Sequence, residues 1–198
     1  MNPKTFIFIG NAGSGKGTQA RFLQEYLKEK DSGTPILYIE TGAGFREAIQ
    51  SDTYTGKQAR IINDTGGLQP SFLAVLMWSK ILFEEFKGNE HLIFDGTPRS
   101  LSEAGMLDIA LSFYKRDKPT VIFLNVSREW ATKRLEGRSA RTDDMSADRI
   151  AHRLSLYETN VLPAINYYCD NSQYSFLDIN GEQKPDEVFK KIIENIIF

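Results

Sequence analysis

Glycine, lysine and threonine residues near the N-terminus are spaced to bind phosphate groups. Residues 10–18 read Gly-Asn-Ala-Gly-Ser-Gly-Lys-Gly-Thr, between a short apolar run and a stretch rich in helix formers. Glycines allow positive φ, so successive N–H groups can turn toward one anion, and the start of a helix adds its dipole. The lysine supplies a positive charge for the outer phosphates, and the hydroxyl of Thr18 comes one place later than in the common motif. The predicted phosphate-binding residues are Gly13, Ser14, Gly15, Lys16, Gly17 and Thr18.

A second group with the chemistry of a nucleotide site lies in residues 91–99, which read His-Leu-Ile-Phe-Asp-Gly-Thr-Pro-Arg. An isolated Asp-Gly pair is more often a turn. Next to a phosphate-binding loop, however, Asp95 at the end of a strand could orient Mg²⁺, directly or through water. Arg99 follows in the loop and could bind a second phosphate with both arms of its guanidinium.

Arginines are concentrated in the following helices. On one helix face Arg134 and Arg138 are four residues apart, and Arg149 and Arg153 repeat this spacing. Arginines clustered in this way usually lie on a solvent-exposed helix surface. A protein that transfers phosphoryl groups, however, needs cations around the transferring group. The remaining members are Arg128, near the start of the first helix, and Arg141, which is followed by Asp143 and Asp144 as possible anchors.

The elements that must position these residues alternate between strands and helices. Apolar runs at 5–9, 36–39, 92–94, 120–126 and 174–179 lack clean alternation, as expected for strands buried on both faces of a parallel sheet. Helical patterns occupy 19–28, 71–86, 127–136, about 146–168 and 185–198. We therefore expect one α/β domain, a doubly wound parallel five-stranded sheet of the P-loop nucleoside triphosphate hydrolase type, with ligands at the carboxyl ends of the strands.

Composition narrows the function classes. A net charge of −2 argues against a general nucleic-acid binder, and the single cysteine, Cys169, excludes disulfides within the chain. We expect Cys169 to be a small buried side chain, and His91 and His152 to be surface or packing residues. No signal-peptide pattern or membrane-length apolar run is present, so a cytoplasmic location is the simplest expectation. The expected partners are small nucleotides, with neither nucleic acid nor membrane, and we expect a monomer.

Five ordered motifs carry a resemblance to the adenylate kinase family of nucleoside monophosphate kinases. They are Gly10-x-x-Gly-x-Gly-Lys-Gly-Thr-Gln19, Thr41-Gly-x-x-x-Arg46, Asp95-Gly-x-Pro-Arg99, Arg134-x-x-x-Arg138 and Arg141-x-Asp-Asp144. The resemblance covers nearly the whole chain. It implies transfer of the γ-phosphate from ATP to AMP, with ATP and Mg²⁺ bound and Asp95 on the metal side.

The resemblance also implies roles for individual residues. Lys16, Arg99, Arg138, Arg141 and Arg153 would act on the transferring phosphoryl group, and Arg134 would lie on the ATP adenine. The monophosphate would be held by Thr41, Gly42, Arg46, Gln69, Gly96, Arg99 and Glu103. The implied core comprises residues 1–40, 71–137 and 145–198, with a mobile monophosphate-binding segment at 41–70 and a very short lid at 138–144. No general base is needed.

Departures from the family pattern leave the acceptor open. Glu103 stands where these kinases carry a glutamine that reads adenine, and a carboxylate only accepts hydrogen bonds. Two adjacent N–H donors of guanine would suit it better, and Gln69 is a second unusual polar residue near the expected base. GMP or a pyrimidine monophosphate is therefore an alternative acceptor. In another alternative for Glu103, its side chain turns to solvent and backbone carbonyls read the base. A non-catalytic nucleotide-binding module is a further alternative, although it would need no acceptor-side arginines.

Overall fold

The computed structural model describes residues 2–137 and 146–196. Its centre is a five-stranded sheet in the order β2-β3-β1-β4-β5, in which every neighbouring pair is parallel. The strands are β1 (Thr5–Gly10), β2 (Ile36–Glu40), β3 (His91–Asp95), β4 (Thr120–Asn125) and β5 (Ser175–Asn180). The predicted doubly wound sheet is confirmed, and the strand ends differ from the prediction by one or two residues.

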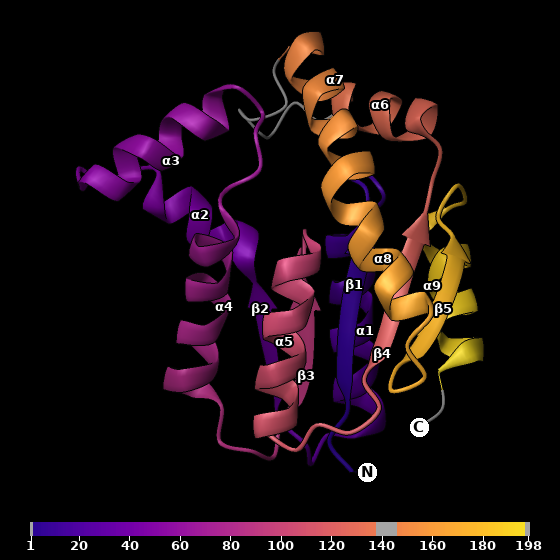
Figure 1. Ribbon diagram of the computed structural model, residues 1–198. Helices are drawn as coiled ribbons and strands as arrows, with labels where there is room; N and C mark the ends of the chain where they lie inside the picture. Colours follow the sequence, from indigo (N-terminus) through magenta and orange to yellow (C-terminus); the bar gives the residue numbers. More distant parts are fainter. Residues whose placement is uncertain (1, 138–145, 197–198) are drawn as a thin grey trace.

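The two faces of the sheet bury alternate residues of each strand. Phe6 and Phe8 of β1 point to the side covered by α1 (Lys16–Lys30) and α9 (Pro185–Asn195). Ile7 and Ile9 point to the opposite side. That side is covered by α4 (Ser71–Glu85), α5 (Leu101–Phe113) and α8 (Leu162–Cys169), which lie in front of the sheet in Figure 1. Burial on both faces explains why the central strands β1, β3 and β4 show no polar alternation, whereas the edge strands β2 and β5 are only partly buried.

Helices α2 (Thr41–Ala48) and α3 (Tyr54–Asp64) form an arm beyond the carboxyl ends of β2 and β3. Figure 1 shows this arm at the upper left, facing α7 (Ala147–Leu156) and α6 (Arg128–Glu136). A small apolar cluster joins the arm to α4, in which Phe45 of α2 and Ala59 of α3 pack with Leu73 and Ala74 of α4. The predicted segment 41–70 thus begins with α2 and ends just before α4.

The helix predicted at about 146–168 is interrupted. It consists of α7, a π-helical turn η2 (Tyr157–Val161) and α8. Pro163 lies in the first turn of α8, where it has no N–H to donate and its ring would collide with the carbonyl of the residue four places earlier. A wider turn before the proline avoids this collision. At the end of α8, Cys169 is exposed, so the expectation of a buried cysteine is wrong.

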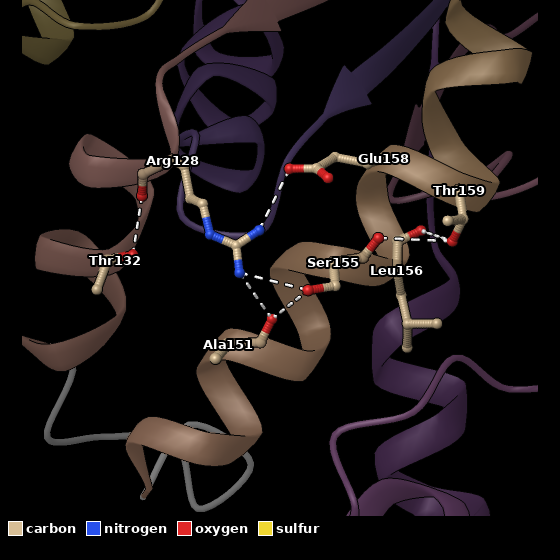
Figure 2. A network of polar contacts seen from close by, with 7 residues as sticks. All are labelled: Arg128, Thr132, Ala151, Ser155, Leu156, Glu158 and Thr159. Carbon is tan, nitrogen blue, oxygen red and sulfur yellow. Dashed lines mark hydrogen bonds and ion pairs between the residues drawn. The ribbon is translucent and has the colours of Figure 1, made fainter.

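Arg128 fastens α6 to the helices that follow residues 138–145. Its guanidinium lies 3.2 Å from Glu158 Oε1, and it donates to the Ala151 carbonyl oxygen at 3.2 Å and to Ser155 Oγ at 3.3 Å (Figure 2). Buried Leu135 and Ile150 lie in the apolar cluster between the same helices. Arg128 is therefore a structural contact that fixes the two helices flanking the predicted lid.

Candidate nucleotide-binding site

The phosphate-binding loop connects β1 to α1 with left-handed backbone at its glycines. Gly13 has φ +82°, and a Cβ there would lie 2.8 Å from the carbonyl oxygen of Ala131. Gly15 has φ +95° and precedes the first residue of α1. Since the first N–H groups of a helix have no partner within the helix, the loop presents donors and the positive end of the α1 dipole at one place. This is the geometry predicted for a phosphate cradle.

The ammonium group of Lys16 lies across this loop. Its Nζ donates to the carbonyl oxygens of Gly10 at 2.9 Å and Asn11 at 2.7 Å, and it lies 3.4 Å from Ser14 Oγ. These contacts hold the positive charge beside the cradle. Ser14 itself is buried, at 5% exposure, and fixes the loop from inside.

Asp95 ends β3 directly beside the start of α1. A Cβ on Gly17 would lie 3.1 Å from Asp95 Oδ2, so a side chain there would crowd the carboxylate, and glycine lets the helix approach it closely. The Tyr38 hydroxyl of β2 donates to the same oxygen at 2.8 Å. Asp95 is therefore held next to the phosphate-binding loop, as its position in the sequence predicted.

Across the cavity from the loop, two arginines and one glutamate converge over Gly42. Arg46 Nη2 lies 2.6 Å from Glu40 Oε1 in an ion pair. A Cβ on Gly42 would lie 3.2 Å from Arg46 Nη1 and 3.8 Å from Arg99 Nη2. Arg99 Nε donates to the carbonyl oxygen of Gly96 at 2.6 Å, which directs its guanidinium toward Gly42.

These groups line a single cavity of about 390 Å³. The cavity runs from the phosphate-binding loop across the ends of β1, β2 and β3 to the arm formed by α2 and α3. The predicted site residues that line it are Gly13, Gly15, Lys16, Gly17, Thr18, Gly42, Arg46, Gln69, Asp95, Gly96, Arg99 and Arg153. The donor and acceptor sides predicted from separate motifs thus share one space.

Several predicted residues lie elsewhere. Thr41 is 1% exposed, and its hydroxyl donates to the Gly96 carbonyl oxygen at 3.2 Å, so it ties α2 to the loop after β3. Arg134 is exposed on α6 and is not among the residues that line the cavity. Arg138 and Arg141, with Asp143 and Asp144, fall outside the described residues.

Glu103 is buried at the start of α5. Its Oε2 accepts hydrogen bonds from the Arg99 backbone N–H at 2.8 Å and from Thr97 Oγ1 at 3.3 Å, across a cis Thr97–Pro98 peptide. The side chain is 2% exposed, so the alternative in which it turns to solvent is wrong. Burial raises the pKa of the carboxyl, against the lowering effect of the Arg99 N–H. In the described residues Glu103 does not line the cavity, and it supports the loop that carries Arg99.

Gln69 lies at the other wall. Its Nε2 donates to the Ala59 carbonyl oxygen at 2.8 Å, and its buried Oε1 has no hydrogen-bond partner among the described residues. An unsatisfied buried acceptor costs free energy unless a donor reaches it. Gln69 lines the cavity, but its Oε1 has almost no exposed surface, so the side chain would have to move before a ligand N–H could reach this atom.

Sequence reasoning missed some cavity residues. Tyr38 and Glu40 alternate with buried residues in β2, and Tyr157 belongs to η2. Burial raises the pKa of Tyr157 to about 12, so its hydroxyl stays protonated. The signal that could have found Tyr38 and Glu40 is a polar pair at the carboxyl end of an otherwise apolar strand.

By contrast, the two histidines are as predicted. His91 is fully buried between the Lys4 N–H and Asp31, and exposed His152 contacts the Thr65 carbonyl oxygen.

Comparison with known proteins agrees with this geometry. The sequence matches the family model described as Adenylate kinase over residues 8–173. The chain belongs to the adenylate kinase family. It is 34% identical over 196 residues to a Flavobacterium psychrophilum adenylate kinase, with 96% of each chain covered. It is 33% identical over 181 residues to one from Prochlorococcus marinus, with 91% of this chain and 93% of the relative covered.

A third relative, from Leptospira biflexa, is also named adenylate kinase and is 33% identical over 196 residues, covering 98% of this chain and 100% of its own length. Membership of the adenylate kinase family makes this chain a phosphotransferase of the nucleoside monophosphate kinase class. Within the described residues, no helix is long and apolar enough to cross a membrane.

Proposed function

We propose that this chain transfers the γ-phosphate of ATP to AMP, giving two molecules of ADP. The observation that carries the proposal is that Lys16, Arg46 and Arg99 line the same cavity. Lys16 belongs to a phosphate-binding loop, whereas the two arginines come from different elements on the opposite side. A module that only bound ATP would need no second pair of guanidinium groups.

On the donor side, the loop N–H groups and Lys16 would hold the ATP phosphates. Within the described part of the chain, no group of three acidic, histidine or cysteine side chains could hold a metal. One carboxylate, Asp95, next to the loop nevertheless suits Mg²⁺, which keeps several waters and binds phosphate oxygens. When bound there, Mg²⁺ would neutralise phosphate charge, and the Tyr38 hydrogen bond would keep Asp95 directed toward it.

The transfer needs no protein nucleophile. An oxygen of the AMP phosphate is already an anion at neutral pH, and it would attack the γ-phosphorus while the bond from that phosphorus to the β,γ-bridging oxygen breaks. The displaced electron pair stays on that oxygen of ADP. Positioning and neutralisation of charge by Lys16, Arg99 and Arg153 would then supply the catalysis. Water must be excluded, or the phosphoryl group would reach a water oxygen.

Closure of the arm at 41–70 and of a short lid at 138–144 would exclude that water. Asn63 and Gln69 of the arm segment line the cavity, and Arg149 of α7 donates to the Asn63 carbonyl oxygen at 2.8 Å near the end of α3. Arg138 and Arg141 of the proposed lid would reach the transferring group, and Arg134 would lie on the adenine of ATP. Residues 1–40, 71–137 and 145–198 would form the core around which these segments close.

The relatives named adenylate kinase support adenine as the acceptor base, and Gln69 is compatible with it. Its buried Oε1 could accept a hydrogen bond from the exocyclic amine. A base-reading role for Glu103 stays a prediction. Guanine also carries N–H donors, so GMP is the second candidate, and the acceptor on Gln69 is equally compatible with it. The Glu103 carboxylate does not add to this candidate, because it binds the Arg99 N–H and the Thr97 hydroxyl and, in the part of the chain that the structure describes, does not line the cavity.

The test is to offer ATP and Mg²⁺ with AMP, GMP, CMP, UMP and dTMP in turn, and to measure diphosphate formation. We expect AMP to give the highest kcat/KM. Absence of turnover with every acceptor would contradict the kinase assignment. Rapid turnover with GMP alone would contradict only the choice of AMP.

A further inference from the structure

A carboxylate lies where the proposed function places an acceptor phosphate. Glu40 is the last residue of β2, and its Oε1 is 2.6 Å from Arg46 Nη2. The same oxygen would lie 3.7 Å from a Cβ on Gly42, the residue that also has the Arg46 and Arg99 guanidinium groups above it. Because Gly42 has no side chain, three charged groups can meet over its backbone.

The charges in this cluster allow a carboxylate and a bound phosphate to compete for the same guanidinium group. A carboxylate offers oxygens and a negative charge to a guanidinium in the same way as a phosphate does. Glu40, Arg46 and Arg99 all line the cavity. We propose that Glu40 competes with the phosphate of the acceptor nucleotide for Arg46, and so weakens binding of the monophosphate. The proposal rests on the acceptor role proposed above for Arg46.

Glu40 could also have the opposite effect and help the monophosphate to bind by orienting Arg46. The solvent exposure of the two side chains bears on which effect is larger. The side chains of Glu40 and Arg46 are 28% and 43% exposed. Ion pairs this open to water hold their partners weakly, so Glu40 contributes little to the order of Arg46. Its negative charge, however, remains beside any phosphate that binds there. Water weakens this repulsion as well, but a bound phosphate can orient Arg46 by itself, so the orienting effect of Glu40 is lost in the complex while the repulsion remains.

The experiment compares Glu40→Gln with the parent chain. Glutamine keeps the length and an acceptor oxygen for Arg46, but removes the charge. We expect the KM for AMP and the Kd for AMP measured by calorimetry without ATP to fall together by about twofold to fivefold, the range that corresponds to an exposed ion pair. The KM for ATP should change by less than about twofold, since the phosphate-binding loop lies on the other side of the cavity.

Two further variants sharpen the result. Glu47→Gln removes an exposed acid from α2, next to Arg46 in sequence, and Glu47 does not line the cavity. It should leave the KM for AMP unchanged. Glu40→Ser removes the same charge with a smaller side chain, so it should also lower the KM for AMP even if the glutamine variant folds poorly.

A fall or no change in AMP affinity in both Glu40 variants would overturn the proposal, and so would an equal gain in affinity in Glu47→Gln, since that would be an effect of net charge. Failure of the proposed function would look different, because the parent chain itself would then neither bind AMP nor turn it over.

Discussion

At the scale of single residues, the acceptor loop depends on a carboxylate that faces inward. Glu103 accepts hydrogen bonds from the Arg99 N–H and the Thr97 hydroxyl. It also begins α5, where Ser100 accepts from its N–H. The residue thereby links the start of the helix to the arginine that faces the acceptor side. Replacing it should act on the loop as well as on any base contact.

Glu103→Gln should alter the pH dependence of stability. Burial raises the pKa of Glu103 from its ordinary value of 4.5. Folding therefore takes up a proton between that value and the raised one, and the free energy of unfolding falls as the pH rises through this interval. The amide of glutamine does not titrate, so the variant takes up no proton at this position on folding. The Tm of Glu103→Gln relative to the parent should increase as the pH rises above the ordinary carboxyl pKa of 4.5. A difference in Tm that stays constant with pH would contradict this.

At the scale of elements, helix α4 carries adjacent apolar residues of which one is buried and the next is exposed. Leu82 is 2% exposed in the main core, whereas its neighbour Phe83 is 87% exposed. Leu82→Ala should lower the free energy of unfolding by about 2–5 kcal/mol, because it removes packed methyl groups and leaves a cavity. Phe83→Ala should change it by about 0.5 kcal/mol or less. Denaturant unfolding of both variants measures the contrast, and equal losses would contradict the packing described for α4.

The sequence predicted the strands and helices better than the π-helical turn that interrupts the helix predicted at about 146–168. Strand β1, the loop and helix α1 follow directly from an apolar run, glycines and helix formers, because each of these acts locally. The π-turn before Pro163 was missed, since the apolar pattern continues through it and only the missing N–H marks the change. Cys169 was misplaced because burial at the end of α8 depends on packing between distant segments.

At the scale of the whole molecule, the sheet order brings the two halves of the site together. β1 pairs with β3, and β3 pairs with β2, so the phosphate-binding loop, Asp95 and Glu40 come from adjacent strand ends. Motif order predicted Lys16, Asp95 and Arg99 correctly as cavity residues. It could not predict the Glu40–Arg46 pair or the inward turn of Glu103, because these depend on side-chain geometry across elements.

The central claim is that one cavity holds a donor and an acceptor nucleotide and that Arg99 belongs to the acceptor side. The most direct measurement compares Arg99→Ala with the parent chain in steady-state transfer from ATP to AMP and in ATP binding measured separately. We expect kcat/KM for AMP to fall by about a hundredfold or more, since a guanidinium at the transferring group is lost. ATP affinity should change by less than about threefold. Intact turnover, or a loss of ATP binding as large as the loss of transfer, would contradict the account.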